Sequence, residues 1–196
     1  MGINTHIPYT RKQTGFTIVE LLIVIVVIAI LAAITIVSYN GIQQRSQNTS
    51  IIATATTWYK TFKLYEADIG KLPTVSGCLG SNYPYDREGN ATGTYQCRQD
   101  TSTTGLSENA TLNTTLQPYM SNRPTPPMVT GGNSATVWRR GIQYYVTGSA
   151  AGSTIRIDVT FSGQGECPSL SGIATSGKTN YSDGNSMCPY VIGTVQ

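Results

Sequence analysis

The feature that most constrains this chain is an apolar stretch near its N-terminus, from Phe16 to Val37. No side chain between Leu21 and Ile34 contains a polar atom. As an α-helix rising about 1.5 Å per residue, the stretch would be roughly 33 Å long, enough to cross the ~30 Å hydrocarbon core of a bilayer. We therefore predict that it forms a membrane-spanning helix.

Charged residues lie just before the apolar stretch and inside it. Arg11 and Lys12 precede it, and residues 1–15 contain no acidic residue. Basic residues favour the cytoplasmic side, so we expect the N-terminus inside and the remainder of the chain outside. Glu20 falls within the first turns of the predicted helix. Because a carboxylate is costly in hydrocarbon, its presence there indicates a function.

These residues together resemble the N-terminal motif of the type IV pilin family, which includes the secretion pseudopilins. The motif is a short basic leader ending in Gly15, a cut before Phe16, Glu20 as fifth residue of the mature chain, and an apolar helix. A conventional secretory signal differs, because its apolar core spans roughly 7–15 residues and its cleavage site follows that core.

The resemblance implies processing followed by polymerisation. A membrane prepilin peptidase would cut between Gly15 and Phe16, and the new N-terminus would be methylated. The apolar helix would reside in membrane lipid and then enter the core of a helical filament, through the inner-membrane pilus assembly machinery. Glu20 would set the register by pairing with the Phe16 ammonium group of a neighbouring subunit. Such a head-to-tail interface repeats as an open helix.

An apolar stripe predicts that the helix continues beyond the membrane segment. Apolar side chains recur at steps of three and four residues, at Ile51, Ala55, Trp58, Phe62, Tyr65 and Ile69. We expect one helix from Phe16 to about Ile69, with this stripe packed on a sheet. Gly70 should end it in a left-handed conformation, and Pro73 prevents its continuation. Any bending or local melting is expected near Asn40–Gly41.

The remaining residues predict a loop-rich head with an antiparallel sheet. The strand-like segments are 135–139, 142–147, 154–161 and 189–195, and the third alternates apolar and polar residues as a half-buried strand does. Residues 71–132 show little regular pattern, except for a short helix around 106–119 and an extended Pro-rich connector at 123–127. Strands that follow one long helix indicate the α+β class.

Four parts follow from these patterns and the resemblance. They are a leader peptide (1–15), a transmembrane or filament-core helix (16–39), an amphipathic continuation of that helix (40–70) and a globular β head (71–196). The expected shape is the ladle of the pilin family, with half of the long helix in the membrane and half packed on the antiparallel sheet.

All four cysteines, Cys78, Cys97, Cys167 and Cys188, follow the apolar stretch. An even number on one side of a membrane segment indicates disulfides in an oxidising compartment. Of the three pairings, sequence proximity favours Cys78–Cys97 and Cys167–Cys188, and the second matches the position of the pilin family's disulfide-bounded C-terminal loop. We expect no metal site, because C-x-x-C pairs are absent and the single histidine, His6, lies in the leader.

Two short segments in the head match sequence patterns of ligand-binding sites. Residues 172–179 match the phosphate-binding pattern G-x-x-x-x-G-K-[ST], but no strand-like segment precedes them and no helical pattern follows, so we expect no nucleotide there. Asp183, Gly184 and Asn185 offer oxygens for Ca²⁺, but one aspartate is far short of the usual shell, and we expect a glycine turn. Glycosylation is weakly indicated by N-x-[ST] sequons at Asn48, Asn90, Asn109, Asn113 and Asn180.

Charge gives no support for nucleic-acid binding. The formal net charge is +3, and removing residues 1–15 would take away two of the 13 basic residues and none of the 10 acidic ones, leaving +1. Arg139 and Arg140, beside Trp138, Tyr144 and Tyr145, could form a small basic and aromatic surface of the kind that binds single strands. We expect these arginines to be solvated edge residues instead.

We interpret the chain as a structural subunit of a type IV pilus-like filament that serves adhesion, motility, DNA uptake or secretion. No catalytic set of side chains is recognisable, so we expect neither an enzyme nor a cofactor. The subunit would first be a single-pass membrane protein with an extracytoplasmic head, and later part of an extracellular filament. The alternative is a signal-anchored extracytoplasmic binding protein that never polymerises, which Glu20 and the Gly15–Phe16 pair argue against. Major pilin, minor pilin and pseudopilin remain open.

Overall fold

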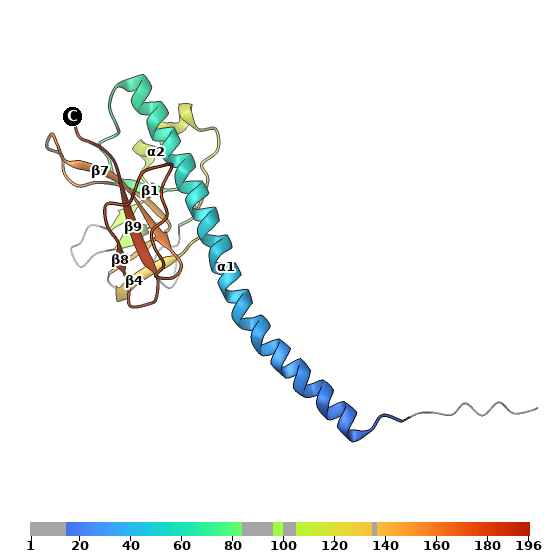
Figure 1. Ribbon diagram of the computed structural model, residues 1–196. Helices are drawn as coiled ribbons and strands as arrows, with labels where there is room; N and C mark the ends of the chain where they lie inside the picture. The colour runs from blue at the N-terminus through green and yellow to red at the C-terminus, as the bar shows by residue number, and fades with distance from the viewer. Residues whose placement is uncertain (1–14, 84–95, 100–104, 135–136) are drawn as a thin grey trace, which may run out of the picture. The chain divides into compact units, whose positions relative to one another are not determined.

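The computed structural model describes residues 15–83, 96–99, 105–134 and 137–196 (Figure 1). Arg11 and Lys12, the basic residues of the predicted leader, therefore lie outside the described residues. The chain divides into two compact units, Met1–Ile42 and Gln43–Gln196, which are described separately below.

Helix α1 runs from Ile18 to Ile69 without interruption. Its helical conformation continues through Asn40 and Gly41, so local melting there is not observed. Gly70 ends the helix with φ +83°, and its N–H donates to the carbonyl oxygen of Glu66 at 2.8 Å. This is the left-handed cap that a glycine permits, and it confirms the predicted C-terminus of the helix.

Two antiparallel sheets form the second unit together with residues 43–69 of α1, and they confirm the α+β class. The five-stranded sheet has the order β1-β6-β7-β9-β8, with β1 Gly77–Leu79, β6 Ile142–Val146, β7 Thr154–Phe161, β9 Ser186–Thr194 and β8 Thr179–Asn180. The four-stranded sheet has the order β3-β2-β5-β4, with β3 Leu106–Ser107, β2 Gln96–Gln99, β5 Val137–Arg140 and β4 Thr130–Ser134. Figure 1 shows β9 beside β8 in this second unit.

The apolar stripe of α1 packs against the five-stranded sheet. Ile51, Ala55, Trp58 and Phe62 are buried in one core with inward-facing residues of β6, β7 and β9. The stripe weakens at its end, because Tyr65 is half-buried and Ile69 is 48% exposed. Leu72, after the cap, joins the core instead.

Strand β7 is buried on both faces, whereas its alternation predicted one solvated face. Asp158 and Thr160 lie on the predicted polar face, yet both are fully buried. The reason is the four-stranded sheet, since β7 contacts both β4 and β5. The head therefore contains a second, more polar core between its sheets.

The chain crosses between the two sheets at Gly141, which separates β5 from β6. Gly141 has φ +60°, and a Cβ there would lie 2.8 Å from the Tyr83 hydroxyl oxygen. Only glycine fits this crossing without strain. The disulfide Cys78–Cys97 also joins the sheets, because Cys78 lies in β1 and Cys97 in β2.

Other elements begin at different residues from those predicted or were not predicted at all. The predicted short helix around 106–119 begins later, with α2 at Ala110–Leu116 followed by the 3₁₀ helix η1 at Gln117–Tyr119. Asn109 is the N-cap, since its side-chain oxygen accepts from the Leu112 N–H at 3.0 Å. Strand β4 lies in the region where no strand was predicted, because its two glycines hide the usual pattern of a strand.

Candidate functional site: the N-terminal segment of α1

The start of α1 is organised by a reciprocal contact between Thr17 and Glu20. The Thr17 N–H donates to Glu20 Oε2 at 2.8 Å, and the Thr17 hydroxyl donates to the same oxygen at 2.7 Å. In return, the Glu20 N–H donates to Thr17 Oγ1 at 3.2 Å. This is a capping box, with Thr17 as N-cap and Glu20 three residues later.

Gly15 and Phe16 lie just before this cap and outside the helix. Both are exposed and in no regular secondary structure, and Phe16 is 81% exposed. An accessible dipeptide outside the helix is one that a peptidase can bind. Among the predicted site residues, the structure therefore places Gly15, Phe16 and Glu20 within two turns of one another.

The helix after Glu20 exposes its apolar side chains in every direction. Each large apolar side chain from Leu21 to Ile36 is at least 47% exposed in the isolated chain. An all-round apolar surface of this kind is typical of a helix that lies in lipid or among other helices. Within the described residues, α1 is the one helix long and apolar enough to span a membrane, judged by length and composition.

Thr17 is the functional residue that sequence reasoning missed. Its signal was present, because Thr17-Ile18-Val19-Glu20 matches the pattern [ST]-x-x-[DE] before an apolar run. The cap binds one oxygen of the Glu20 carboxylate, Oε2, within its own chain.

The phosphate-loop pattern at residues 172–179 does not form a phosphate-binding loop. Leu170 pairs with Ile173 in a tight turn, and Gly172 has φ +87° within that turn. The residues that follow enter the short strand β8, and no helix starts there. From residue 172 to the C-terminus, a range that the structure describes in full, no helix begins whose N-terminus could bind a phosphate.

The Asp183-Gly184-Asn185 segment is a turn that holds two parts of the head together. Asp183 Oδ2 accepts from the Gly132 N–H at 2.8 Å, and Gly184 has φ +84°. The Asn185 side chain accepts from the Gly163 N–H and donates to the Thr130 carbonyl oxygen. Within the described parts of the chain, no group of three potential metal-ligating His, Cys, Asp or Glu side chains occurs.

Two sequon asparagines have structural roles, while a third lies outside the described residues. Asn48 donates to the Ser162 carbonyl oxygen at 2.9 Å and accepts from the Ser162 N–H at 3.0 Å. Asn109 caps α2, and Asn90 is the one outside the described ranges.

The arginines of β5 are not solvated edge residues, and they do not form an exposed surface with aromatic rings. Arg140 is 3% exposed, and its Nε donates to Thr130 Oγ1 at 2.8 Å, over the ring of Trp138. Trp138 and Tyr144 are fully buried. Arg139 lies at the centre of the four-stranded sheet, opposite Arg98 of β2. The four-stranded sheet that contains Trp138 and Arg140 was not predicted. Tyr144 is buried instead against α1, where its ring stacks on Phe62.

Both disulfides follow the pairing that sequence proximity favours. Cys78 is bonded to Cys97 and Cys167 to Cys188. The second closes the segment that contains β8 onto β9. Tyr190 supports this closure, because its hydroxyl donates to the Pro168 carbonyl oxygen at 2.6 Å.

Comparison with known proteins identifies the N-terminal segment. Residues 10–36 match the family model described as the prokaryotic N-terminal methylation motif. The chain carries a prepilin methylation motif. Gly15, Phe16, Thr17 and Glu20 all fall inside the matched range.

Two curated relatives of this prepilin-motif chain are similar over part of their length. Type II secretion system core protein G of Dickeya chrysanthemi is 25% identical over 88 residues, 39% of this chain and 58% of the relative. Prepilin peptidase-dependent protein D of Escherichia coli (strain K12) is 38% identical over 71 residues, 36% of this chain and 47% of the relative. The chain thus spans about half the length of these relatives. No solved structure matches the chain.

Proposed function

We propose that this protein is a structural, non-enzymatic subunit of a type IV pilus-like filament, and that it polymerises through the N-terminal part of α1. The observation that carries the proposal is the prepilin methylation motif at 10–36, joined to an apolar helix with a capped Glu20. The names of the two relatives, a secretion core protein and a prepilin peptidase-dependent protein, support the same class.

Processing would occur at the exposed Gly15–Phe16 bond. A prepilin peptidase would remove residues 1–15 as the leader, and methylation of the Phe16 amine would follow. Before processing, residues 16–39 would lie in membrane lipid with Arg11 and Lys12 on the cytoplasmic side. Residues 40–70 would carry the head, residues 71–196, on the extracytoplasmic side, and the pilus assembly machinery of the inner membrane would move the subunit into an extracellular filament.

Glu20 would have two partners in succession. In the isolated subunit, Oε2 is bound by Thr17, while Oε1 has no hydrogen bond among the described residues. After processing, the Phe16 ammonium group of a neighbouring subunit would pair with this carboxylate. Such a pair between apolar helices disfavours misregistered neighbours, because a shifted subunit would leave both charges unpaired.

N-terminal sequencing and mass determination of the protein from its native membrane test the processing step. We expect a chain that begins at methylated Phe16. A Gly15→Val variant should keep its leader, because a branched side chain then occupies the position before the bond. A mature wild-type chain that still begins at Met1 would rule out the proposal.

Electron microscopy of surface filaments tests the register role of Glu20. We expect Glu20→Lys to abolish filaments while the processed subunit still accumulates in the membrane. The matched control is Glu166→Lys, which makes the same charge change at an exposed residue of the head. Normal filaments from Glu20→Lys would show that Glu20 does not set the register, even if processing is intact.

A further inference from the structure

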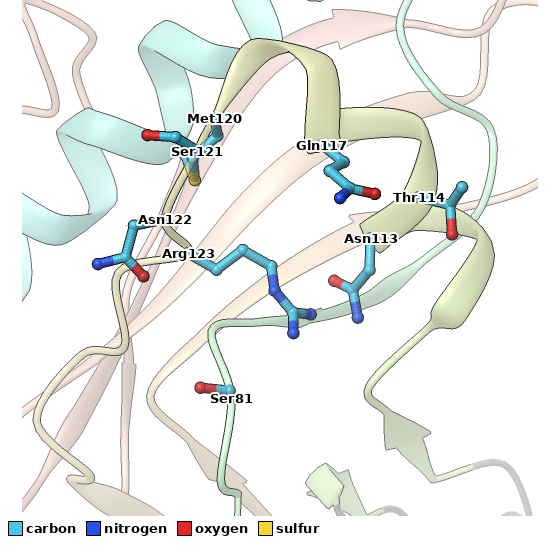
Figure 2. A pocket seen from close by; sticks show the side chains of 8 residues that line it. All are labelled: Ser81, Asn113, Thr114, Gln117, Met120, Ser121, Asn122 and Arg123. Carbon is cyan, nitrogen blue, oxygen red and sulfur yellow. The ribbon is translucent and has the colours of Figure 1, made fainter.

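The head contains a polar pocket of about 350 Å³ between α2, η1 and the connector that follows them (Figure 2). Asn113, Thr114 and Gln117 line one side, Asn122 and Arg123 the other, and Ser81 a third. Its size falls at the lower end of the range for small-molecule sites. Nothing in the proposed filament function uses this pocket.

Arg123 gives the pocket its chemical character. Its Nη1 atom is buried and has no hydrogen-bond partner within the described part of the chain. Figure 2 shows the guanidinium group lying between the Asn113 amide and Ser81. The guanidinium group of Arg123 lines the pocket, and an oxyanion is the ligand that best satisfies the donors of a guanidinium group.

The walls of the pocket are held in place by contacts behind them. Trp58 Nε1 donates to the Pro124 carbonyl oxygen at 3.0 Å, which fixes the residue next to Arg123. Thr125 Oγ1 accepts from the Ser81 N–H at 3.0 Å. On the α2 side, Asn109 Nδ2 donates to the Ser76 carbonyl oxygen at 3.1 Å. A pocket fixed in this way needs little ordering when a ligand binds, so less affinity is lost.

The lining selects a ligand with one negative charge and several hydroxyl groups. Arg123 is the charged lining residue, and no acidic side chain lines the pocket within the described residues. Asn113, Gln117 and Asn122 each bring an amide, which both donates and accepts hydrogen bonds. Paired donors and acceptors of this kind match the hydroxyl groups of a sugar, and the guanidinium fork matches a carboxylate.

We propose that this pocket binds a uronate, a carboxylated sugar unit, either free or within an acidic polysaccharide. Arg123 binds the carboxylate in a bidentate manner. The amides of Asn113 and Gln117 bind the hydroxyl groups of the ring. The polymerisation segment and this pocket are separate sites, so the proposal stands independently of the filament function.

Calorimetric titration of the full chain in detergent micelles tests this assignment, with D-glucuronate as the probe. We expect saturable binding of glucuronate, and at least about tenfold weaker binding of uncharged D-glucose and of acetate, since each lacks one half of the recognised chemistry. An oligomer of glucuronate distinguishes the sources: tighter binding than the monomer indicates a polysaccharide, and equal binding indicates the free sugar. Acetate binding as tightly as glucuronate would overturn the sugar assignment.

Variants test which residues bind the probe. Arg123→Gln should weaken glucuronate binding about tenfold or more, and Arg123→Lys should weaken it less, because the charge remains and the fork is lost. Arg45→Gln removes an exposed arginine outside the pocket and should bind as wild type. Asn113→Ala provides a second lining variant if Arg123→Gln fails to fold by circular dichroism. No saturable binding by wild type, or equal loss in Arg45→Gln, would overturn the proposal.

Discussion

The ring of Phe62 stacks on the ring of Tyr144, with centroids 4.2 Å apart and an interplanar angle of 20°. This contact joins α1 directly to β6, which lies between β1 and β7 in the five-stranded sheet. Tyr144 is itself fixed, because its hydroxyl donates to the Pro73 carbonyl oxygen at 2.6 Å. Tyr144 therefore links three parts of the head: the helix through Phe62, the segment after the helix cap through Pro73, and the sheet through its own strand β6.

Replacing Phe62 by alanine should destabilise the head by about 3–5 kcal/mol, because it opens a cavity in a fully buried core. Denaturant unfolding followed by tryptophan fluorescence measures this, since Trp58 and Trp138 are both buried in the head. Lys60→Ala, on the exposed side of the same helix, is the control and should change the unfolding midpoint little. Equal midpoints for the two variants would contradict the stacking as a stabilising contact.

Tyr83→Phe should cost about 1–3 kcal/mol although it removes a single oxygen atom. The fully buried Tyr83 hydroxyl lies 2.8 Å from the Leu79 carbonyl oxygen and accepts from the Ile142 N–H at 3.2 Å. Phenylalanine would leave these backbone groups unsatisfied between the two sheets. Urea unfolding of Tyr83→Phe against Tyr59→Phe, a half-buried tyrosine of α1, provides the comparison. If Tyr83→Phe lowered the free energy of unfolding no more than Tyr59→Phe does, the predicted role of the Tyr83 hydroxyl would be wrong.

How far the sequence predicts the fold depends on whether each segment has its own pattern. The stripe from Ile51 to Phe62 and the strand at 154–161 have clear periods of three to four and of two, and a helix and a strand form at these positions as predicted. The four-stranded sheet consists of strands of two to five residues, and only β5 falls on a segment that was predicted as a strand, 135–139. The other three are too short or, in β4, too rich in glycine to show a period. Asp158 therefore looked solvent-facing, because a pattern of alternation does not show what covers the polar face.

The N-terminal segment and the polar pocket also differ in how far the sequence predicts them. The N-terminal segment is contiguous, so Gly15, Phe16 and Glu20 were predicted from one short motif, and Thr17 could have been. The polar pocket combines Ser81 with residues 113–123 through tertiary contacts. No spacing in the sequence brings Ser81 to Arg123.

The buried carboxylate of Asp158 predicts an unusual pH dependence. Burial raises the pKa of Asp158 above its ordinary value of 3.8, while Arg156 at 2.7 Å, Arg139 and Arg98 oppose this shift. Between pH 3.8 and the folded-state pKa, the native state retains a proton that the unfolded state has released. In that window this residue's contribution to the free energy of unfolding falls as the pH rises.

Asp158→Asn should remove this contribution. The difference in unfolding free energy, wild type minus variant, should decrease as the pH rises through the window, and denaturant titrations from pH 3 to 7 would measure it. Glu166→Gln, at an exposed carboxylate, controls for the loss of one negative charge. A difference that stays flat or increases with pH would show that the arginines outweigh burial.

Mild reduction should open the two disulfides in a defined order. Cys78 and Cys97 are fully buried, whereas Cys167 is half-buried at the edge of the C-terminal segment. Because thiol–disulfide exchange needs access to a sulfur atom, we expect dithiothreitol to reduce Cys167–Cys188 first. Alkylation at timed intervals followed by peptide mass spectrometry gives the order. Loss of the Cys167–Cys188 bond should destabilise the head by about 3 kcal/mol. Labelling of Cys78 before Cys167 would contradict the predicted order.

Thr17 should matter for assembly through its hydroxyl group alone. The hydroxyl donates to Glu20 Oε2 at 2.7 Å and accepts from the Glu20 N–H, so it orients the carboxylate that the proposed filament uses. Thr17→Ala removes both contacts and should reduce the number of filaments, while Thr17→Ser keeps them and should assemble as wild type. Filament counts by electron microscopy, normalised to processed subunit in the membrane, separate assembly from processing. Equal counts for the alanine and serine variants would show that Glu20 does not depend on Thr17 for its orientation.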